Sequence, residues 1–131
     1  MRSGVWVRIA SHTWDSWGRI EGVELEVAAG NDKWAGCASW WVAPPLFPSD
    51  VDRLREWDGE GECAVLETAQ SAIRFQNKWG RAACDVFIED GANRVRLAFW
   101  TELAAIDRFR SELVALEREL KGEASLWVGV S

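Results

Sequence analysis

The sequence contains no tyrosine and only one histidine, His12. A single histidine leaves little material for general acid–base catalysis, because histidine is the side chain most often used for it near neutral pH. The three cysteines, Cys37, Cys63 and Cys84, lack CxxC spacing, which is unlike a zinc knuckle or a dithiol redox pair. We therefore expect no metal, no cofactor and no catalytic residues, and we expect that the protein is not an enzyme.

Long apolar stretches are also missing. No apolar run approaches the roughly 20 residues of a membrane-spanning helix. The first residues, MRSGVWVRIASHTW, lack the continuous apolar core of a signal peptide. Cysteines that remain reduced are typical of cytoplasmic proteins. These absences predict a cytoplasmic protein without a membrane partner.

The length and composition are those of one globular domain. The chain has 131 residues, of which 48% are hydrophobic and 27% charged. A chain of this size buries enough surface to fold without a disulfide or a metal. We expect a single domain over residues 1–131.

The formal net charge is −6, and its distribution is uneven. Residues 15–32 hold five carboxylates against one arginine, and residues 50–67 hold seven against two, whereas residues 68–101 hold five basic side chains against three acidic ones. An acidic chain gains no counterion-release energy on phosphate, so we expect no nucleic acid partner. A basic protein is the favoured partner, although a solvated rim that maintains solubility explains the same charges.

Alternation of apolar and polar residues predicts a series of strands. We expect them at about residues 5–9, 23–27, 34–43, 62–69, 72–77, 82–89 and 93–100. Turn-forming residues at 11–18 predict a loop. Leu126 begins a further alternating segment, with Val128 and Val130, that is either an eighth strand or a frayed tail.

Two segments have helical signals. Residues 50–57 predict a short helix with Ser49 as N-cap and Asp52 at the third helical position. After Thr101, which we expect to cap the longest helix, apolar residues recur every three or four positions as far as Leu120. Together the elements predict an α+β fold, with an antiparallel sheet of about six to eight strands and the long C-terminal helix packed on one face.

Ten tryptophans are too many for one small core. Trp40 and Trp41 are consecutive on a predicted strand, so they point to opposite faces, and we expect Trp41 to be available to a partner. Trp57 falls on the apolar face of the short helix, where we expect burial. Trp14 and Trp17 lie in the predicted polar loop and are candidate contacts for a partner or a sugar ring.

The acidic run after the short helix supplies the other candidate partner-binding residues, Asp58, Glu60 and Glu62. Their oxygens alternate with glycines as in calcium loops, but the remaining ligand positions of an EF-hand are missing. We interpret the run as a solvated acidic turn that contacts a basic protein.

From Leu54 onward the order of features resembles a known family. The run LREWDGEGE at 54–62 leads into hairpins with the segments IRF at 73–75 and GRAACDV at 80–86, followed by NRVRLAF at 93–99 and a closing helix. Residues 46–120 resemble the WapI-type immunity proteins of bacterial polymorphic toxin systems. The resemblance implies a non-enzymatic protein that binds and silences a cognate toxin, and it assigns no catalytic residue.

Three hypotheses remain open from the sequence. The first is a protein-binding immunity or regulatory domain, whose carboxylates occupy the phosphate-binding surface of a basic nuclease toxin. The second is a small-ligand or carbohydrate-binding module that stacks sugars on Trp14, Trp17 or Trp41. The third is a homo-oligomeric structural protein in which tryptophans form the interface between subunits.

Overall fold

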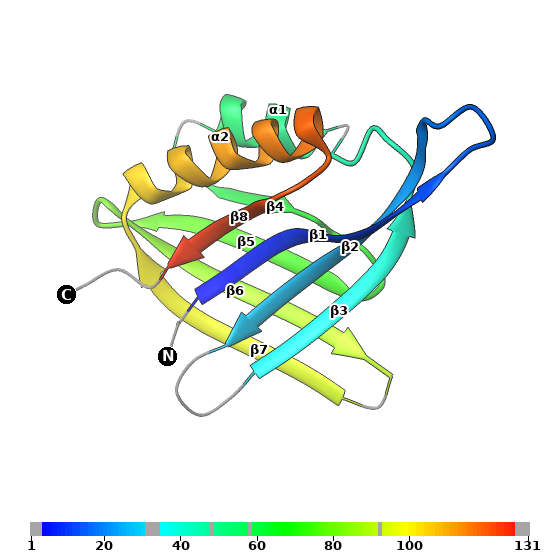
Figure 1. The fold of residues 1–131 in the computed structure, drawn as a ribbon. Helices are drawn as coiled ribbons and strands as arrows, with labels where there is room; N and C mark the ends of the chain where they lie inside the picture. Colours follow the sequence, from blue (N-terminus) through cyan, green and yellow to red (C-terminus); the bar gives the residue numbers. More distant parts are fainter. Residues whose placement is uncertain (1–3, 31–34, 48, 58, 92, 128–131) are drawn as a thin grey trace.

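A computed structural model describes residues 4–30, 35–47, 49–57, 59–91 and 93–127 (Figure 1). Within these residues eight strands and two helices follow one another along the chain. They are β1 (Gly4–Trp14), β2 (Ile20–Gly30), β3 (Ala35–Val42), α1 (Asp50–Glu56), β4 (Glu62–Val65), β5 (Ser71–Lys78), β6 (Arg81–Asp90), β7 (Asn93–Thr101), α2 (Leu103–Glu119) and β8 (Glu123–Trp127).

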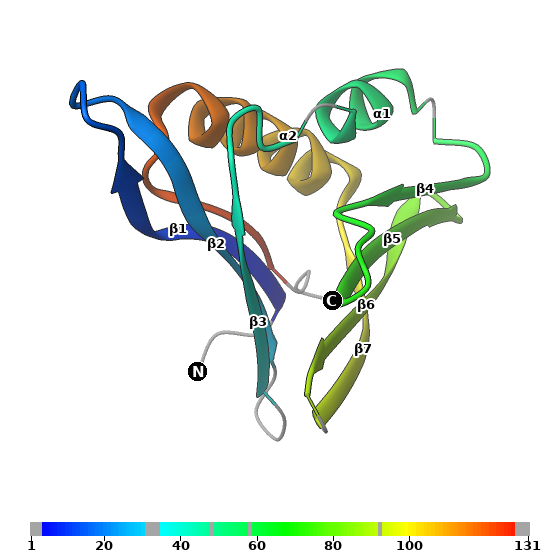
Figure 2. The ribbon, with the colours of Figure 1, turned by 90° about the vertical axis from the view of Figure 1, so that its right-hand side faces the viewer.

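The strands form two antiparallel sheets of four. Sheet A has the order β3-β2-β1-β8 and sheet B the order β4-β5-β6-β7. The sheets approach each other near β3 and β7 and diverge toward α1 and α2, which cover the wide end (Figure 2). This confirms the predicted α+β fold with a long C-terminal helix, but the strands divide into two sheets where we expected one. Two sheets that both carry an apolar inner face bury those faces against each other.

The core lies between the sheets and beneath α2. Alternate residues of the strands point inward, as the period of two requires; the fully buried ones include Val5, Val7, Val23, Val27, Ile73, Phe75 and Val86. The helix contributes the predicted stripe at three- and four-residue spacing, with Ile106, Phe109, Leu113 and Leu116 buried. The stripe therefore closes one end of the core formed by the two sheets.

Gly36 sets how closely the two sheets approach. A Cβ atom at this position would lie 2.5 Å from Cγ2 of Val95 on β7. Because real Cβ atoms do not approach so closely, only glycine fits here without a shift of β3 or β7. The close approach of β3 and β7 thus depends on a residue without a side chain.

Both helices differ in detail from expectation. Ser49 occupies the N-cap of α1, but its side chain makes no capping hydrogen bond. Thr101 does not cap α2: it belongs to β7, where it pairs with Ala82, and its Oγ1 donates to the carbonyl oxygen of Trp127 at 2.9 Å. Glu102 takes the N-cap position. Pairing with β6 therefore keeps Thr101 in sheet B, and its side chain links that sheet to β8 of sheet A.

The end of α2, the last strand and residues 11–14 can also be compared with the expectations from the sequence. Leu120, with φ of +54°, is the C-cap of α2. β8 confirms the eighth strand, whereas Val128 and Val130 lie outside the described residues. Residues 11–14, predicted as loop, continue β1, because they pair with β2. No helix in the described part of the chain is long and apolar enough to cross a bilayer.

Candidate interaction surfaces

The single histidine and two of the three cysteines are packed into the fold. Nε2 of His12 lies 2.5 Å from the carbonyl oxygen of Leu120, so the ring ties β1 to the end of α2. Cys63 and Cys84 are buried, while Cys37 is exposed on β3. Among the described residues, no group of three or more His, Cys, Asp or Glu is placed to hold a metal ion.

The pKa values of the three cysteine thiols predict how readily each thiol reacts. Burial raises the pKa of Cys84 to about 12 and raises the pKa of Cys63. Burial and then the carboxylate of Glu26 raise the pKa of Cys37. Because the thiolate is the reactive form, an aromatic disulfide reagent at pH 8 should modify Cys37 slowly and leave the other two thiols unmodified. Unfolding in denaturant should release all three thiols; fast reaction of Cys63 or Cys84 in the native protein would contradict this arrangement.

Tryptophan and phenylalanine are distributed differently. Phe47, Phe75, Phe99 and Phe109 are buried, whereas none of the nine tryptophans in the described ranges is buried. The exposed fractions of five of them are 60% for Trp14, 81% for Trp17, 55% for Trp41, 91% for Trp79 and 38% for Trp100. Both residue types gain free energy from burial. The hydrophobic effect within this chain therefore does not account for where these five tryptophans lie.

The first exposed group lies at the end of the β1–β2 hairpin, which extends away from the body of the protein (Figure 1). We call residues 14–19 the hairpin tip. Oδ1 of Asp15 accepts hydrogen bonds from the backbone N–H groups of Trp17 (2.8 Å) and Arg19 (2.9 Å), and the N–H of Asp15 donates to the carbonyl of Arg19 (2.8 Å). These bonds fix the turn that presents Trp17. Trp14 lies against the ring of His12, with 6.0 Å between centroids.

Trp41 does not join this group. Trp40 packs against the core and Trp41 is exposed, which confirms that consecutive tryptophans point to opposite faces. Trp41 pairs with Glu24 of β2 on the outer face of sheet A. Trp14 instead lies on the side of β1 where His12 meets α2. The predicted residues Trp14 and Trp41 therefore do not share one face.

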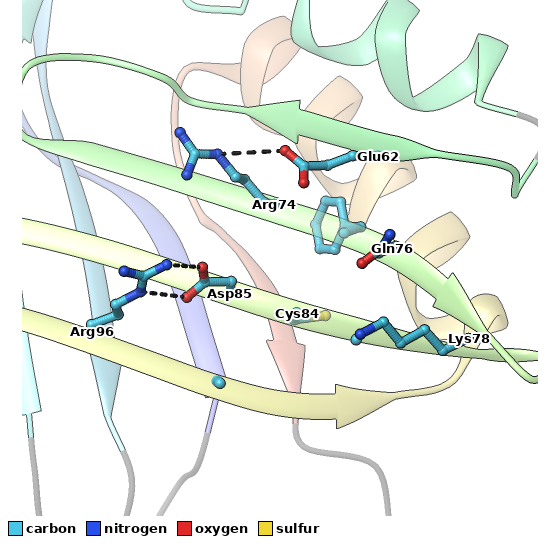
Figure 3. A pocket seen from close by; sticks show the side chains of 10 residues that line it. Glu62, Arg74, Gln76, Lys78, Cys84, Asp85 and Arg96 are labelled. Atoms are coloured by element: carbon cyan, nitrogen blue, oxygen red, sulfur yellow. Dashed lines mark hydrogen bonds and ion pairs between the residues drawn. The ribbon is translucent and has the colours of Figure 1, made fainter.

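A hollow of about 460 Å³ lies on the outer face of sheet B (Figure 3). We call it the sheet B hollow. Ala83 and Ala98 line it with small side chains. At one end Arg96 donates from Nη2 and Nε to the carboxylate of Asp85 at 2.7 and 3.2 Å, and this hydrogen bonding lowers the pKa of Asp85. The predicted residue Glu62 faces the hollow and forms an ion pair of 3.7 Å with Arg74.

A pair of tryptophans stands beside the sheet B hollow. The rings of Trp79 and Trp100 are stacked, with centroids 6.3 Å apart and an angle of 26° between planes. The guanidinium carbon of Arg81 lies 5.8 Å from the centre of the Trp100 ring. Sequence reasoning did not select this pair. The sequence did contain a signal for Trp79. Trp79-Gly80 lies between two predicted strands, where a two-residue hairpin turn favours Asn-Gly, so tryptophan is unusual at this position.

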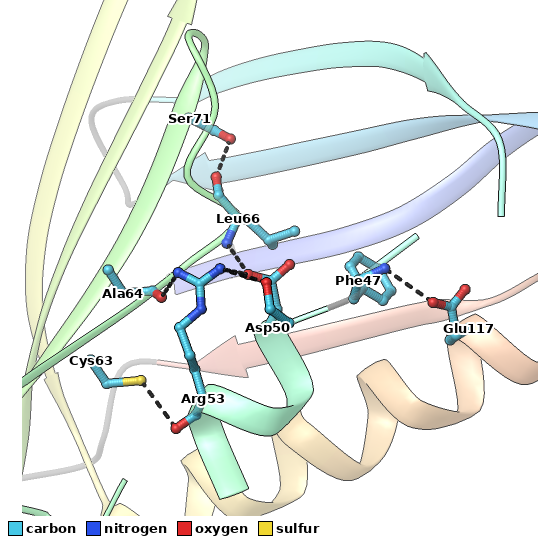
Figure 4. Close-up of polar contacts among 9 residues, drawn as sticks. Phe47, Asp50, Arg53, Cys63, Ala64, Leu66, Ser71 and Glu117 are labelled. Atoms are coloured by element: carbon cyan, nitrogen blue, oxygen red, sulfur yellow. Dashed lines mark hydrogen bonds and ion pairs between the residues drawn. The ribbon is translucent and has the colours of Figure 1, made fainter. Parts of the chain in front are cut away.

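The two acidic stretches do not form one surface. The described residues of the first stretch, 15–30, lie along sheet A and its hairpin, and those of the second, 50–57 and 59–67, lie along α1 and β4 on the side of sheet B (Figure 2). Part of the charge is also neutralised within the fold. Glu26 pairs with Arg8 at 2.6 Å, and Asp50 is buried, where Oδ1 accepts from the N–H of Leu66 at 3.1 Å (Figure 4).

Of the predicted acidic run, the structure describes Glu60 and Glu62. Asp58 lies outside the described residues. Glu60 is exposed, and its carbonyl oxygen accepts a hydrogen bond from Nε1 of Trp57 at 3.1 Å. Trp57 is half-buried, packed near Phe75 with centroids 6.3 Å apart, so its predicted burial is partial. Glu60 thus lies close to the end of α1.

Comparison with known proteins identifies no family. No protein-family model, no curated protein and no solved structure matches this chain. The similarity of residues 46–120 to WapI-type immunity proteins therefore stays a prediction from the sequence. What the protein does has to follow from its own surfaces.

Proposed function

We propose that this protein is a non-enzymatic protein-binding domain, and that its partner is a toxin, as in the WapI-type immunity proteins. The observation that carries the proposal is the exposure of five tryptophans on ordered strands and turns, while four of the five phenylalanines are buried. Tryptophan is among the residues most enriched at the energetic centres of protein interfaces. An exposed tryptophan held by a rigid scaffold is suited to binding.

The hairpin tip provides the anchor for this partner. Trp17 is 81% exposed, and hydrogen bonds to Asp15 hold the backbone on both sides of it. A turn that is already ordered loses little conformational entropy when a partner binds, so more of the contact energy appears as affinity. A protruding tip of this kind enters a pocket more readily than a flat sheet does.

Electrostatics support a basic partner at long range. The formal net charge is −6, and a field of one sign raises the encounter rate with a protein of the opposite sign. Charge at the rim of an interface alters the association rate and its salt dependence more than the affinity. We therefore assign the approach of the partner to the carboxylates and the contact to Trp17.

The test uses the protein encoded by the reading frame adjacent to this one. We expect co-expression of the two proteins to rescue growth that the neighbour inhibits, and Trp17→Ala to lower the affinity about 30-fold, which corresponds to the roughly 2 kcal/mol of an interface hot spot. The melting temperature should not change, because the side chain is 81% exposed.

Val114→Ala is the matched control, since this apolar side chain is also exposed but lies on α2. Its affinity for the neighbour should equal that of the unsubstituted protein. Failure of the unsubstituted protein to bind the neighbour or to rescue growth would exclude the toxin partner. Equal binding by the Trp17→Ala variant would exclude the hairpin tip as the anchor.

A further inference from the structure

We propose that the Trp79–Trp100 pair and the sheet B hollow form a second binding surface, separate from the hairpin tip. This surface accepts a protein segment that carries a carboxylate beside an aromatic or aliphatic side chain. The hairpin tip belongs to sheet A and this surface to sheet B (Figures 1 and 2). The inference therefore does not depend on what Trp17 binds.

The backbone of Trp79 is the first observation. Trp79 and Gly80 form the turn between β5 and β6, with φ of +57° and +81°. Asparagine and glycine adopt this left-handed region readily, whereas a bulky residue does so at a cost. Trp79 is also 91% exposed, so its ring gains little from burial in the isolated chain. The turn needs this backbone conformation but not a tryptophan in it, so an exposed bulky residue kept here at a cost indicates a function outside the fold.

Strand pairing makes the tryptophan pair continuous with the hollow. Trp100 of β7 lies directly opposite Ala83 of β6, which in turn lies opposite Gln76 of β5. Ala83 and Gln76 both line the hollow. A side chain seated on the two tryptophans would therefore be followed by chain that lies over small residues, where a backbone can approach the sheet closely.

The charges on this surface select an acidic segment. Three arginines are each paired with a carboxylate: Arg74 with Glu62 at 3.7 Å, Arg81 with Glu102 at 3.6 Å and Arg96 with Asp85 at 2.7 Å. The ammonium of Lys78, which also lines the hollow, has no ion pair within the described part of the chain. Glu62, Glu102 and Asp85 each already have an arginine partner, whereas Lys78 has no carboxylate partner within the described residues. An incoming carboxylate can therefore pair with Lys78, and an incoming cation meets no free carboxylate of this set.

The decisive variant is Trp79→Asn. It removes the anchor and supplies the Asn-Gly turn that this hairpin geometry favours, so the melting temperature should stay the same or rise. We would select a display library of random dodecapeptides against the unsubstituted protein and against this variant. The unsubstituted protein should enrich peptides with Asp or Glu next to Trp, Phe or Leu, and Trp79→Asn should bind the best of them at least tenfold more weakly.

Charge reversal tests the second half of the proposal. Lys78→Glu should lower the affinity for the selected acidic peptide at least tenfold, whereas Lys121→Glu, an equal change of net charge at an exposed position after α2, should change it less than twofold. Raising the salt concentration should weaken binding to the unsubstituted protein.

Several results would overturn the inference. They are the absence of any enriched peptide, enrichment of basic peptides, or equal binding by the unsubstituted protein and Trp79→Asn. A glycan array gives the remaining outcome: binding of a neutral oligosaccharide that Trp79→Asn abolishes, without any peptide binding, would assign the surface to carbohydrate. None of these experiments involves the partner of the hairpin tip.

Discussion

Replacement of Phe109 by alanine will lower the free energy of unfolding by about 3–5 kcal/mol. Phe109 is fully buried in the middle of α2 and belongs to the core that the two sheets share. Truncation removes the contacts of the ring and leaves a cavity under the helix that the sheets cannot fill without moving. The loss is large against the total stability of roughly 5–15 kcal/mol that is usual for a domain.

Urea denaturation followed by tryptophan fluorescence measures this loss directly. Val114→Ala, on the same helix but 37% exposed, should cost less than about 1 kcal/mol, because its side chain loses little buried area. A loss below about 1 kcal/mol for Phe109→Ala would show that α2 does not close the core.

The second large effect should come from Glu117. Its carboxylate accepts hydrogen bonds from the backbone N–H groups of Leu46, at 2.7 and 2.8 Å, and of Phe47, at 3.0 Å. Figure 4 shows Glu117 on α2 facing Phe47. Leu46 and Phe47 are themselves buried. One helix side chain therefore holds the segment that leads from β3 to α1.

We expect Glu117→Ala to destabilise the protein by about 2–4 kcal/mol, because it leaves two N–H donors without an acceptor and each such group costs about 1–3 kcal/mol. Glu117→Gln keeps one acceptor oxygen and should lose about half as much. Glu119→Ala, at the exposed end of α2, is the control and should be near neutral.

Hydrogen exchange provides a local measurement for the same contact. The amides of Leu46 and Phe47 should exchange faster in Glu117→Ala, while those of β6 should change only as far as global stability changes. Unchanged protection at Leu46 and Phe47 would show that other groups hold this segment.

The elements of the fold follow from periodicity, which depends on local chain geometry. The spacing of Ile106, Phe109, Leu113 and Leu116 identifies the buried stripe of α2 before any contact is known. The opposite exposure of Trp40 and Trp41 follows in the same way from the period of two along a strand.

The division into two sheets could not be predicted in this way. The alternation of apolar and polar residues along a strand indicates which of them face inward. It does not indicate which other strand lies beside it. β8 pairs with β1 across almost the whole chain, and no local pattern encodes that choice. For the same reason the acidic stretches could be counted from the sequence but not placed, and the structure puts them beside different sheets.

The candidate surfaces also differ in whether the sequence alone could predict them. Exposure of Trp14 and Trp17 was foreseen from the polar residues around them, because a polar turn has little apolar surface with which to cover a ring. The Trp79–Trp100 pair was not foreseen, because the two residues are far apart in the chain and meet only through the register of β5, β6 and β7.

The sequence by itself determined that this is an α+β domain, with an amphipathic C-terminal helix and more tryptophan than its core contains. These properties depend on the order of residues within single elements. Tertiary structure alone decided which tryptophans stand together and which carboxylates are already paired with arginine. Those outcomes depend on strand register and sheet packing, which bring together residues distant in sequence.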